Sequence, residues 1–428
     1  MIFGKHEPNT IEQFNAIRKK AVKAALMADG HFGYVMPVGG VAAFDNHVMV
    51  SGVGFDIACG NCAIKTDIKM HEWLGLTACE AKANPSRIKN NVELNHIADK
   101  IASTISFGIG RFNRANDAPI DHSLFNDAAW YAIPNIGKFR EELKDKARRQ
   151  LGTVGSGNHY VDIFVDPSDD SIWVGVHFGS RGLGHTIATN FLAISQGGRW
   201  GDKGKETDSM LDLETSAGAE YWALMNLAGT YAYVGRDWVS ETVVKLIGGK
   251  AIDKVHNHHN FAWKETHPVD GQLKELIVVR KGATPAFAGQ RGFVGGSMGD
   301  DAVILQGASS LKDAAQQNGA LFSTVHGAGR VMSRAEAVGK RDWKTGKPKR
   351  DPVTGEINAG KISPVMMDSW MTQKGVVLRG GGLDESPHVY RRLPEVLEAQ
   401  GTTIEILHTL RPLIVVMAGQ NETDPYKD

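Results

Sequence analysis

The chain has 428 residues, of which 42% are hydrophobic, so it is long enough to bury one large core or two ordinary ones. No apolar run is long enough to span a membrane and the N-terminus lacks a signal-peptide layout, so we expect a cytoplasmic protein with no membrane partner. The 48 basic residues balance the 48 acidic ones, which argues against a protein that coats nucleic acid through its bulk charge and leaves only a local positive surface for RNA.

The first half of the chain is predicted to alternate between helices and short strands. A helix is expected over 11–27, because Thr10 can cap it and its apolar residues recur at helical spacing. Short buried strands between glycine turns are expected over 35–68. Three helices, over 87–105, 121–131 and 136–151, should follow, and then two strands within 159–177.

The second half continues the alternation. Amphipathic helices are expected over 219–234 and 237–247, and strands on either side of the glycine-rich segment 281–299. A polar, basic excursion at about 339–361 reads as a hairpin-like surface loop, either simply solvated or in contact with RNA. The end of the chain reads as two helices and a strand, followed by a flexible tail at 421–428. Because we find no repeat and no linker, we predict a mixed α/β (α+β) fold with one domain over 1–428.

One stretch, LFSTVHGAGRVMSR at 321–334, has the composition of a reactive site. His326 stands between a β-type run and a glycine-flanked turn, where small residues leave room for a bulky reactant. Arg330 and Arg334 follow, and guanidinium groups suit phosphate oxygens. A histidine placed in this way could attack a phosphoryl group and hold it covalently. Taken alone, the stretch is equally compatible with a structural histidine and two solvated arginines.

Five side chains that suit a divalent metal stand at strand–turn junctions: Asp56, Cys59, His159, His177 and His259. Such a set could hold two ions that share a bridging thiolate, and the thiolate by itself would favour zinc. The three cysteines are too few for a disulfide framework, so a reducing compartment is expected. Cys62 forms a CxxC pair with Cys59, but no second pair completes a four-cysteine zinc site.

Six blocks, in order along the chain, resemble the RtcB family of tRNA-splicing and RNA-repair ligases. They are GFDIACG at 54–60, LGTVGSGNHYVDI at 151–163, VHFGSRGLG at 176–184, HHNFAWKE at 258–265, RKGATPAFAGQRGFVGGSMG at 280–299 and HGAGRVMSR at 326–334. The resemblance runs from about residue 35 to about residue 415. It implies a single compact fold around a cleft that holds two metal ions.

The resemblance also implies an activity: joining an RNA 3′-phosphate or 2′,3′-cyclic phosphate to a 5′-hydroxyl. His326 would take GMP from GTP, the GMP would pass to the RNA 3′-phosphate, and the 5′-hydroxyl would displace it. The five metal-type side chains fall on the family's ligand positions, and the family uses two manganese ions. An archease-like protein assists many members and is an expected activator.

Further positions carry over by the same resemblance. The nucleotide would be contacted by Asn158, Asp162, Ser297 and Ala328. RNA phosphates or similar anions would be bound by Arg181, Arg330 and Arg334.

Several positions depart from the family's pattern and leave base specificity open. Asp162 stands where typical members have a glutamate that reads guanine, and Ala418 replaces a lysine that also contacts guanine. Phe178 replaces a serine, Gly295 replaces a proline, and the segment 283–286 is altered. We therefore predict weaker selectivity for GTP over ATP, or a rearranged base pocket, and the chain could be a divergent paralogue.

Two other functions remain open on the sequence. A metal-dependent phosphoesterase that processes RNA ends would need the metal ligands but not His326. A catalytically degenerate RNA-binding paralogue would need neither, and the complete metal-type set argues against it.

Overall fold

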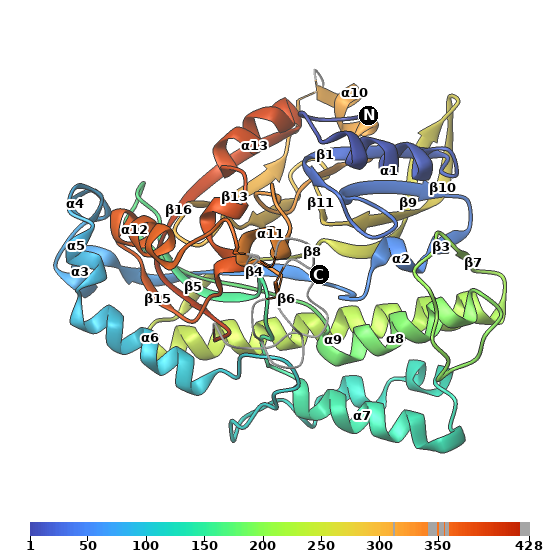
Figure 1. The fold of residues 1–428 in the computed structure, drawn as a ribbon, viewed down its shortest axis with the longest axis horizontal. Helices are drawn as coiled ribbons and strands as arrows, with labels where there is room; N and C mark the ends of the chain where they lie inside the picture. Colours follow the sequence, from blue (N-terminus) through green and yellow to red (C-terminus); the bar gives the residue numbers. More distant parts are fainter. Residues whose placement is uncertain (311–312, 341–348, 351–354, 356–358, 420–428) are drawn as a thin grey trace.

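The computed structural model describes residues 1–310, 313–340, 349–350, 355 and 359–419. It has the mixed helix-and-sheet fold that the alternation of elements predicted (Figure 1). The segment 339–361, predicted as a hairpin-like loop that is either solvated or in contact with RNA, lies mostly outside the described residues. The predicted tail at 421–428 lies wholly outside them. No described helix is both long and apolar enough to cross a bilayer.

An eight-stranded sheet forms the centre of the molecule. Its path is β12 (Arg291–Val294), β13 (Ala302–Gly307), β16 (Ile404–Met417), β5 (Tyr160–Val165), β6 (Ser171–Phe178), β4 (Gly60–Lys69) and β8 (Ala251–His258), with β15 (Val377–Arg379) beside β16. Every residue of β5 and β6 is buried, so the sheet is covered on both faces at these two strands.

Smaller sheets lie against the large one. The four-stranded sheet has the order β1 (Lys23–His31), β2 (Val38–Phe44), β10 (Gln272–Lys281) and β9 (Asn260–Val269). Two-stranded pairs join β11 (Ala283–Pro285) to β14 (Ser323–Val325), and β3 (His47–Met49) to β7 (Met210–Asp212).

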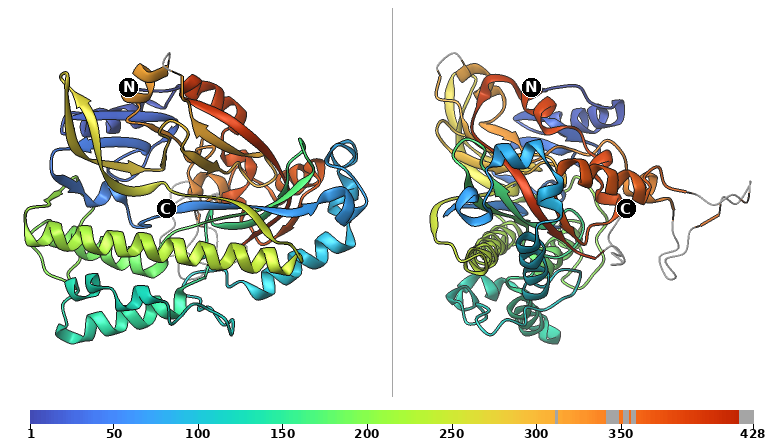
Figure 2. Two further views of the ribbon diagram at one scale, coloured as in Figure 1. Left: turned by 180° about the vertical axis from the view of Figure 1, so that it is seen from behind. Right: turned by 90° about the vertical axis from the view of Figure 1, so that its left-hand side faces the viewer.

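Helices cover the sheets. The longer ones are α1 (Pro8–Arg18), α6 (Val92–Thr104), α7 (Phe139–Gln150), α8 (Arg181–Ile194), α9 (Ser216–Leu246), α12 (Pro364–Lys374) and α13 (Leu393–Gln400). Figures 1 and 2 show α9 running the length of the large sheet, with α8 beside it and α7 outside them. Val239 and Val243 of α9 pack with Ile97 of α6 against Val161 and Val174 of the sheet.

Short helices complete the connections. They are α2 (Val50–Val53), α3 (Met70–Leu74), α4 (Ala78–Ala83), α5 (Ser86–Lys89), α10 (Ala314–Gly319), α11 (Arg334–Val338), and the 3-10 turns η1 (Ser123–Asn126), η2 (Ala128–Ala132), η3 (Ile136–Lys138), η5 (Leu383–Glu385), η6 (Pro387–Val389) and η7 (Gly401–Thr403).

The structure corrects two predicted helices. The helix expected over 11–27 ends at Arg18, and the apolar run after it is strand β1, which pairs with β2. The helix expected before the last strand does not form, because residues 404–417 make one strand that pairs first with β13 and then with β5. In both places a short apolar run fits either period, and long-range strand pairing decides the outcome.

Other predicted elements differ in their bounds or in their type of helix. The stretches 219–234 and 237–247 belong to one helix, α9, of 31 residues. The helix expected over 121–131 is replaced by the turns η1 and η2. The expected strands within 159–177 and around the glycine-rich segment, and the helix near 136–151, are confirmed by β5, β6, β10, β13 and α7.

Candidate metal and nucleotide site

Neighbouring strands of the large sheet bring the metal-type side chains to one end. In the pairing of β4 with β6 and β8, Gly60 lies opposite both Phe178 and His258. Cys59 precedes Gly60, and His177 precedes Phe178 in β6. His259 follows His258 at the end of β8. His159 comes immediately before β5, which pairs with β6. Residues more than a hundred positions apart therefore meet at one edge.

The atoms of this cluster are close enough to share metal ions. The Cys59 Sγ lies 3.2 Å from the His177 Nε2 and 3.6 Å from the His159 Nε2. The His159 Nε2 lies 3.1 Å from the Asp56 Oδ2. Two groups with ligand-type atoms within 4.8 Å of one another result: Cys59, His177 and His259, and Asp56, Cys59 and His159. Because Cys59 belongs to both groups, its sulfur could bridge two ions.

The protonation states suit a divalent metal. The His159 Nδ1 lies 2.9 Å from the Val154 carbonyl oxygen, and donation there leaves the lone pair of Nε2 directed into the cluster. Burial lowers the pKa of His177 and His259 well below the usual value, so both imidazoles are in their neutral, ligating form. The His259 Nδ1 is buried without a hydrogen-bond partner among the described residues. A buried nitrogen without a partner is suited to bind a metal ion.

The charge state of the Cys59 thiol also indicates a site for a cation. Burial, and then the Asp56 carboxylate, raises the pKa of Cys59 well above the usual value. A bound cation reverses that effect and stabilises the thiolate. A Cβ at Gly179 would lie 2.2 Å from the Asp56 Oδ1, so a larger residue there would displace the Asp56 carboxylate. The residues present therefore fit a two-metal centre.

A third metal-type group is already satisfied by other partners. Cys62, Asp237 and His256 also offer atoms within 4.8 Å of one another. However, Lys254 donates to the Asp237 carboxylate over 2.8 Å, and Arg236 donates to the His256 Nε2 over 2.8 Å. A metal ion at this position would have to displace both the Lys254 and the Arg236 side chains.

His326 follows strand β14 and is held by a carboxylate that sequence reasoning missed. The His326 Nδ1 lies 2.6 Å from the Asp29 Oδ2, and the backbone N–H groups of His326 and Gly327 donate to the same oxygen over 3.0 and 3.3 Å. Burial alone would raise the pKa of Asp29, but the His326 side chain and backbone hold it below its usual value. A carboxylate this close to Nδ1 favours the tautomer that carries its hydrogen on Nδ1 and its lone pair on Nε2.

The metal cluster and His326 lie side by side. The ring centroids of His259 and His326 are 4.9 Å apart, and those of His177 and His259 are 5.0 Å apart. A ligand bound at the metal cluster would therefore lie within reach of the His326 imidazole.

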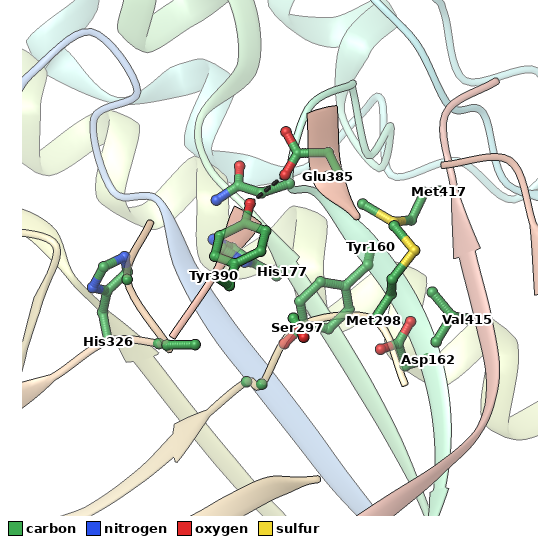
Figure 3. Close-up of a pocket in the computed structure, with 16 residues that line it drawn as sticks. Tyr160, Asp162, His177, Ser297, Met298, His326, Glu385, Tyr390, Val415 and Met417 are labelled. Carbon is green, nitrogen blue, oxygen red and sulfur yellow. Dashed lines mark hydrogen bonds between the residues drawn. The ribbon is translucent and has the colours of Figure 1, made fainter. Parts of the chain in front are cut away.

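A pocket opens beside His326 (Figure 3) and brings together the four expected nucleotide contacts, Asn158, Asp162, Ser297 and Ala328. In Figure 3, His326 lies on one side of the pocket, and Asp162, Val415 and Met417 lie on the other. The Ser297 hydroxyl donates to Asp300 over 2.6 Å. The apolar side chains near Asp162 could pack against a flat ring, and Gly327, which follows His326, adds no side chain to the pocket.

Asp162 differs from an ordinary surface carboxyl. Burial raises its pKa well above the usual value, and the backbone of Val416 offsets this only in part. Its Oδ1 is buried without a partner among the described residues. Burial therefore favours the uncharged form of this acid, and one of its oxygen atoms is free to bind a ligand.

The three arginines have different surroundings. Arg181 and Arg334 line a second cleft, on the Asp56 and His159 side of the cluster, together with Lys146. Arg334 pairs with Asp384 over 2.8 Å and also with Glu385. Among the residues that the structure describes, Arg330 lines neither pocket.

Arg330 is held by the same acidic segment. It donates to the Asp384 carbonyl oxygen over 2.9 Å and to the Tyr390 hydroxyl over 3.2 Å. Tyr390 in turn donates to Glu385. Of the three arginines, Arg330 and Arg334 are thus already partnered by Asp384, Glu385 and Tyr390.

Two further buried groups were not found from the sequence. Asp29 sits in the apolar run AALMADG, where a lone acid next to a glycine was its only signal. Lys281 lies beside Gly282, whose Cβ position is 3.0 Å from the His326 Cε1, and burial lowers the pKa of Lys281 to about 8. The basic pair in RKGATP was the available signal for this lysine.

The fold and site define an α/β protein with a candidate two-metal centre of Asp, Cys and His ligands beside a carboxylate-bound histidine. Residues 11–418 match the family model described as tRNA-splicing ligase RtcB. The chain belongs to this family.

Named relatives agree over nearly the whole chain. It is 29% identical to the tRNA-splicing ligase RtcB of Archaeoglobus fulgidus, with 92% of this chain and 87% of the relative covered. It is 28% identical to the RNA-splicing ligase RtcB of Escherichia coli K12, with 92% and 89% covered. It is also 28% identical to the RNA-splicing ligase RtcB of Mycobacterium tuberculosis, with 87% and 91% covered.

Proposed function

We propose that this protein is a manganese- and nucleotide-dependent RNA ligase that joins RNA 3′-phosphate or 2′,3′-cyclic phosphate ends to 5′-hydroxyl ends, in tRNA splicing or RNA repair. The observation that carries the proposal is the His326–Asp29 pair, placed between the Asp, Cys and His cluster and a pocket with apolar walls. Family membership supports the same activity. The three cysteines are all free, which fits the cytoplasm as the site of action.

The first step would form a covalent His326–nucleotide intermediate. The Nε2 lone pair attacks the α-phosphorus of GTP or ATP, a P–N bond forms, and the P–O bond to pyrophosphate breaks. The Asp29 carboxylate stabilises the positive charge that the imidazole acquires. Two divalent ions on Asp56, Cys59, His159, His177 and His259, when bound, would neutralise the triphosphate and the departing pyrophosphate.

The later steps would use the second cleft. An RNA 3′-phosphate oxygen attacks the phosphorus on His326, which breaks the P–N bond and transfers the nucleotide. A 5′-hydroxyl then attacks the RNA phosphate and releases the nucleotide monophosphate. Arg181 and Lys146 line the second cleft and are suited to the RNA phosphates. Arg334 also lines this cleft, but it would have to exchange its carboxylate partners to bind a phosphate.

Asp162 is the group that would contact the base. A carboxylate offers two acceptors, which suits the two neighbouring N–H groups of guanine. An uncharged acid offers one donor and one acceptor, a combination that adenine and guanine can both match. We therefore expect weaker selectivity for GTP than a charged carboxylate would give.

The test is the intact-protein mass after incubation with Mn²⁺ and either GTP or ATP, for the wild type and for His326→Ala. We expect a nucleotide-monophosphate adduct on the wild type alone, with comparable yields from the two nucleotides. Strict use of GTP at low concentration would refute the relaxed base pocket. Absence of any adduct would favour an RNA-end phosphoesterase, and hydrolysis of a 2′,3′-cyclic phosphate would then be measured.

A requirement for an archease-like activator is tested in the same assay. If the first step is slow with the protein alone, addition of such an activator should raise the rate of adduct formation without changing its dependence on His326.

A further inference from the structure

One fully buried arginine contacts three of the strand ends that carry the candidate metal ligands. Arg236 lies in α9 and has no solvent-exposed surface. Its Nη1 donates to the carbonyl oxygens of Ala58, over 2.9 Å, and Phe178, over 2.6 Å. Its Nη2 lies 2.8 Å from the His258 Nδ1. Each partner is the immediate neighbour of a candidate ligand, because Ala58 precedes Cys59, Phe178 follows His177, and His258 precedes His259.

The acceptors are unusual for a buried cation. All four hydrogen bonds of Arg236 go to carbonyl oxygens or imidazole nitrogens, the fourth being to the His256 Nε2 over 2.8 Å. Burying a guanidinium without a carboxylate partner costs free energy. We therefore expect Arg236 to have a function that offsets this cost. A planar fork with five donors can bridge several strand ends at fixed angles, which a lysine amine cannot do.

The two other histidines of the HNHHNF motif, His256 and His258, form hydrogen bonds with Arg236. His256 and His258 accept from Arg236, and the Tyr233 ring packs on both imidazoles, with centroids 4.3 and 3.9 Å away. The His256 Nδ1 lies 3.4 Å from the Asp237 carboxylate. With its Nδ1 hydrogen directed at Asp237, His256 keeps the Nε2 lone pair for Arg236.

We propose that Arg236 is a positioning residue which fixes Cys59, His177 and His259 relative to one another, so that metal affinity depends on its guanidinium group. This inference rests on the proposed metal centre. Strand pairing holds Gly60 against Phe178 and His258, but without the hydrogen bonds of Arg236 the ligands just beyond these pairs would be held less tightly, and the ligand distances would spread. Metal sites tolerate only small errors in these distances.

The experiment uses Co²⁺ as an optical probe, because a thiolate bound to cobalt gives a sulfur-to-metal charge-transfer band. Wild type, Arg236→Lys and Arg236→Met are titrated with Co²⁺, and Mn²⁺ affinity is measured by competition. We expect Arg236→Lys to weaken binding at least tenfold and to shift the band. Arg236→Met should weaken binding further if the variant folds.

Arg280→Lys is the matched control. Arg280 is also fully buried and also multiply bonded, but to Glu265, Ser323 and the Leu321 carbonyl oxygen. Its loss should lower thermal stability and leave the cobalt band and the affinity unchanged.

A second pair of variants changes His256, a partner of Arg236 that is not itself next to a candidate ligand. His256→Gln keeps an acceptor for the Arg236 Nε and should retain near wild-type affinity, whereas His256→Leu should weaken binding. A folded Arg236→Lys with wild-type affinity and band would overturn the inference. A wild type that gives no thiolate band would instead overturn the metal centre, and the inference with it.

Discussion

At the scale of single residues, the chemistry depends on two buried carboxyl groups whose pKa values are shifted in opposite directions. Asp29 contacts an imidazole and two backbone N–H groups, and its pKa is held low. Asp162 has an oxygen without a partner among the described residues, and burial raises its pKa. The first acid is suited to holding a charge near the nucleophile, and the second to meeting a base as a neutral group.

Replacing Asp29 by asparagine should abolish most of the reactivity of His326. An amide can donate to Nδ1, which places the ring hydrogen on Nε2 and removes the nucleophilic lone pair. We expect adduct formation to fall by about 10²–10⁴-fold, measured by single-turnover mass spectrometry. Metal affinity should stay at the wild-type value, and an Asp29→Asn variant with the wild-type rate of adduct formation would show that the pair has no catalytic role.

Replacing Asp162 by asparagine should stabilise the protein in a pH-dependent way. Because the folded pKa of Asp162 is raised, its contribution to stability is fully present below the unfolded pKa of about 3.9 and is lost as pH rises above it. The amide cannot ionise, so Asp162→Asn should exceed the wild type in free energy of unfolding at pH 8 and match it near pH 4. Urea unfolding at the two pH values measures this.

Asp166→Asn is the control for that series. Asp166 is equally buried but is bound to His408, over 2.6 Å, and to Ser168. Its replacement should destabilise the protein at pH 8, and a stabilising effect there would contradict the explanation given for Asp162.

At the scale of elements, the site depends on how closely neighbouring strands approach. A Cβ at Gly60 would lie 2.1 Å from the Asn257 carbonyl oxygen and 2.9 Å from the His258 Cα, so β4 and β8 can meet only through a glycine. This contact sets the separation of Cys59 from His259.

Gly60→Ala should therefore separate the two strands. We expect a loss of roughly 1–3 kcal/mol in stability, together with weaker metal binding, measured by calorimetric titration with Mn²⁺. Gly75→Ala is the control, because Gly75 has a φ of +65° with no atom within 4 Å of its Cβ position. Equal metal affinity in both variants would show that the approach of β4 to β8 does not control the cluster.

At the scale of the whole molecule, binding of metal should be linked to folding. The candidate ligands come from segments spread over residues 56–259, and an unfolded chain cannot hold them together. At a free Mn²⁺ concentration 100 times the dissociation constant, the stabilisation should be about 2.7 kcal/mol for each ion bound. For a chain of 428 residues this corresponds to a rise in Tm of about 3 °C per ion. Cys59→Ser should lose the rise, and chelation should reverse it.

We also propose that residues 1–428 form one domain. Strand β16, at the C-terminal end of the described chain, pairs with both β13 and β5. Strand β10 pairs with β2 from the first tenth of the chain. Such long-range pairing predicts a single calorimetric unfolding transition, whereas two resolved transitions would contradict it.

The sequence by itself determined the elements with a clear period and the residues with distinctive chemistry. The strands within 159–177, the helix near 136–151 and the identity of the metal-type side chains were all readable locally. These features depend on short-range patterns and on residue type, which tertiary contacts seldom override when the pattern is long.

Only the tertiary structure decided the rest. The run at 23–27 is a strand because β2 lies beside it, and residues 404–417 are one strand because β13 and β5 flank it. The contact of Asp29 with His326 joins residues 297 positions apart, and Arg236 contacts the immediate neighbours of three candidate ligands. Such pairings depend on which segments the folded chain brings together, because no local pattern encodes a partner that distant.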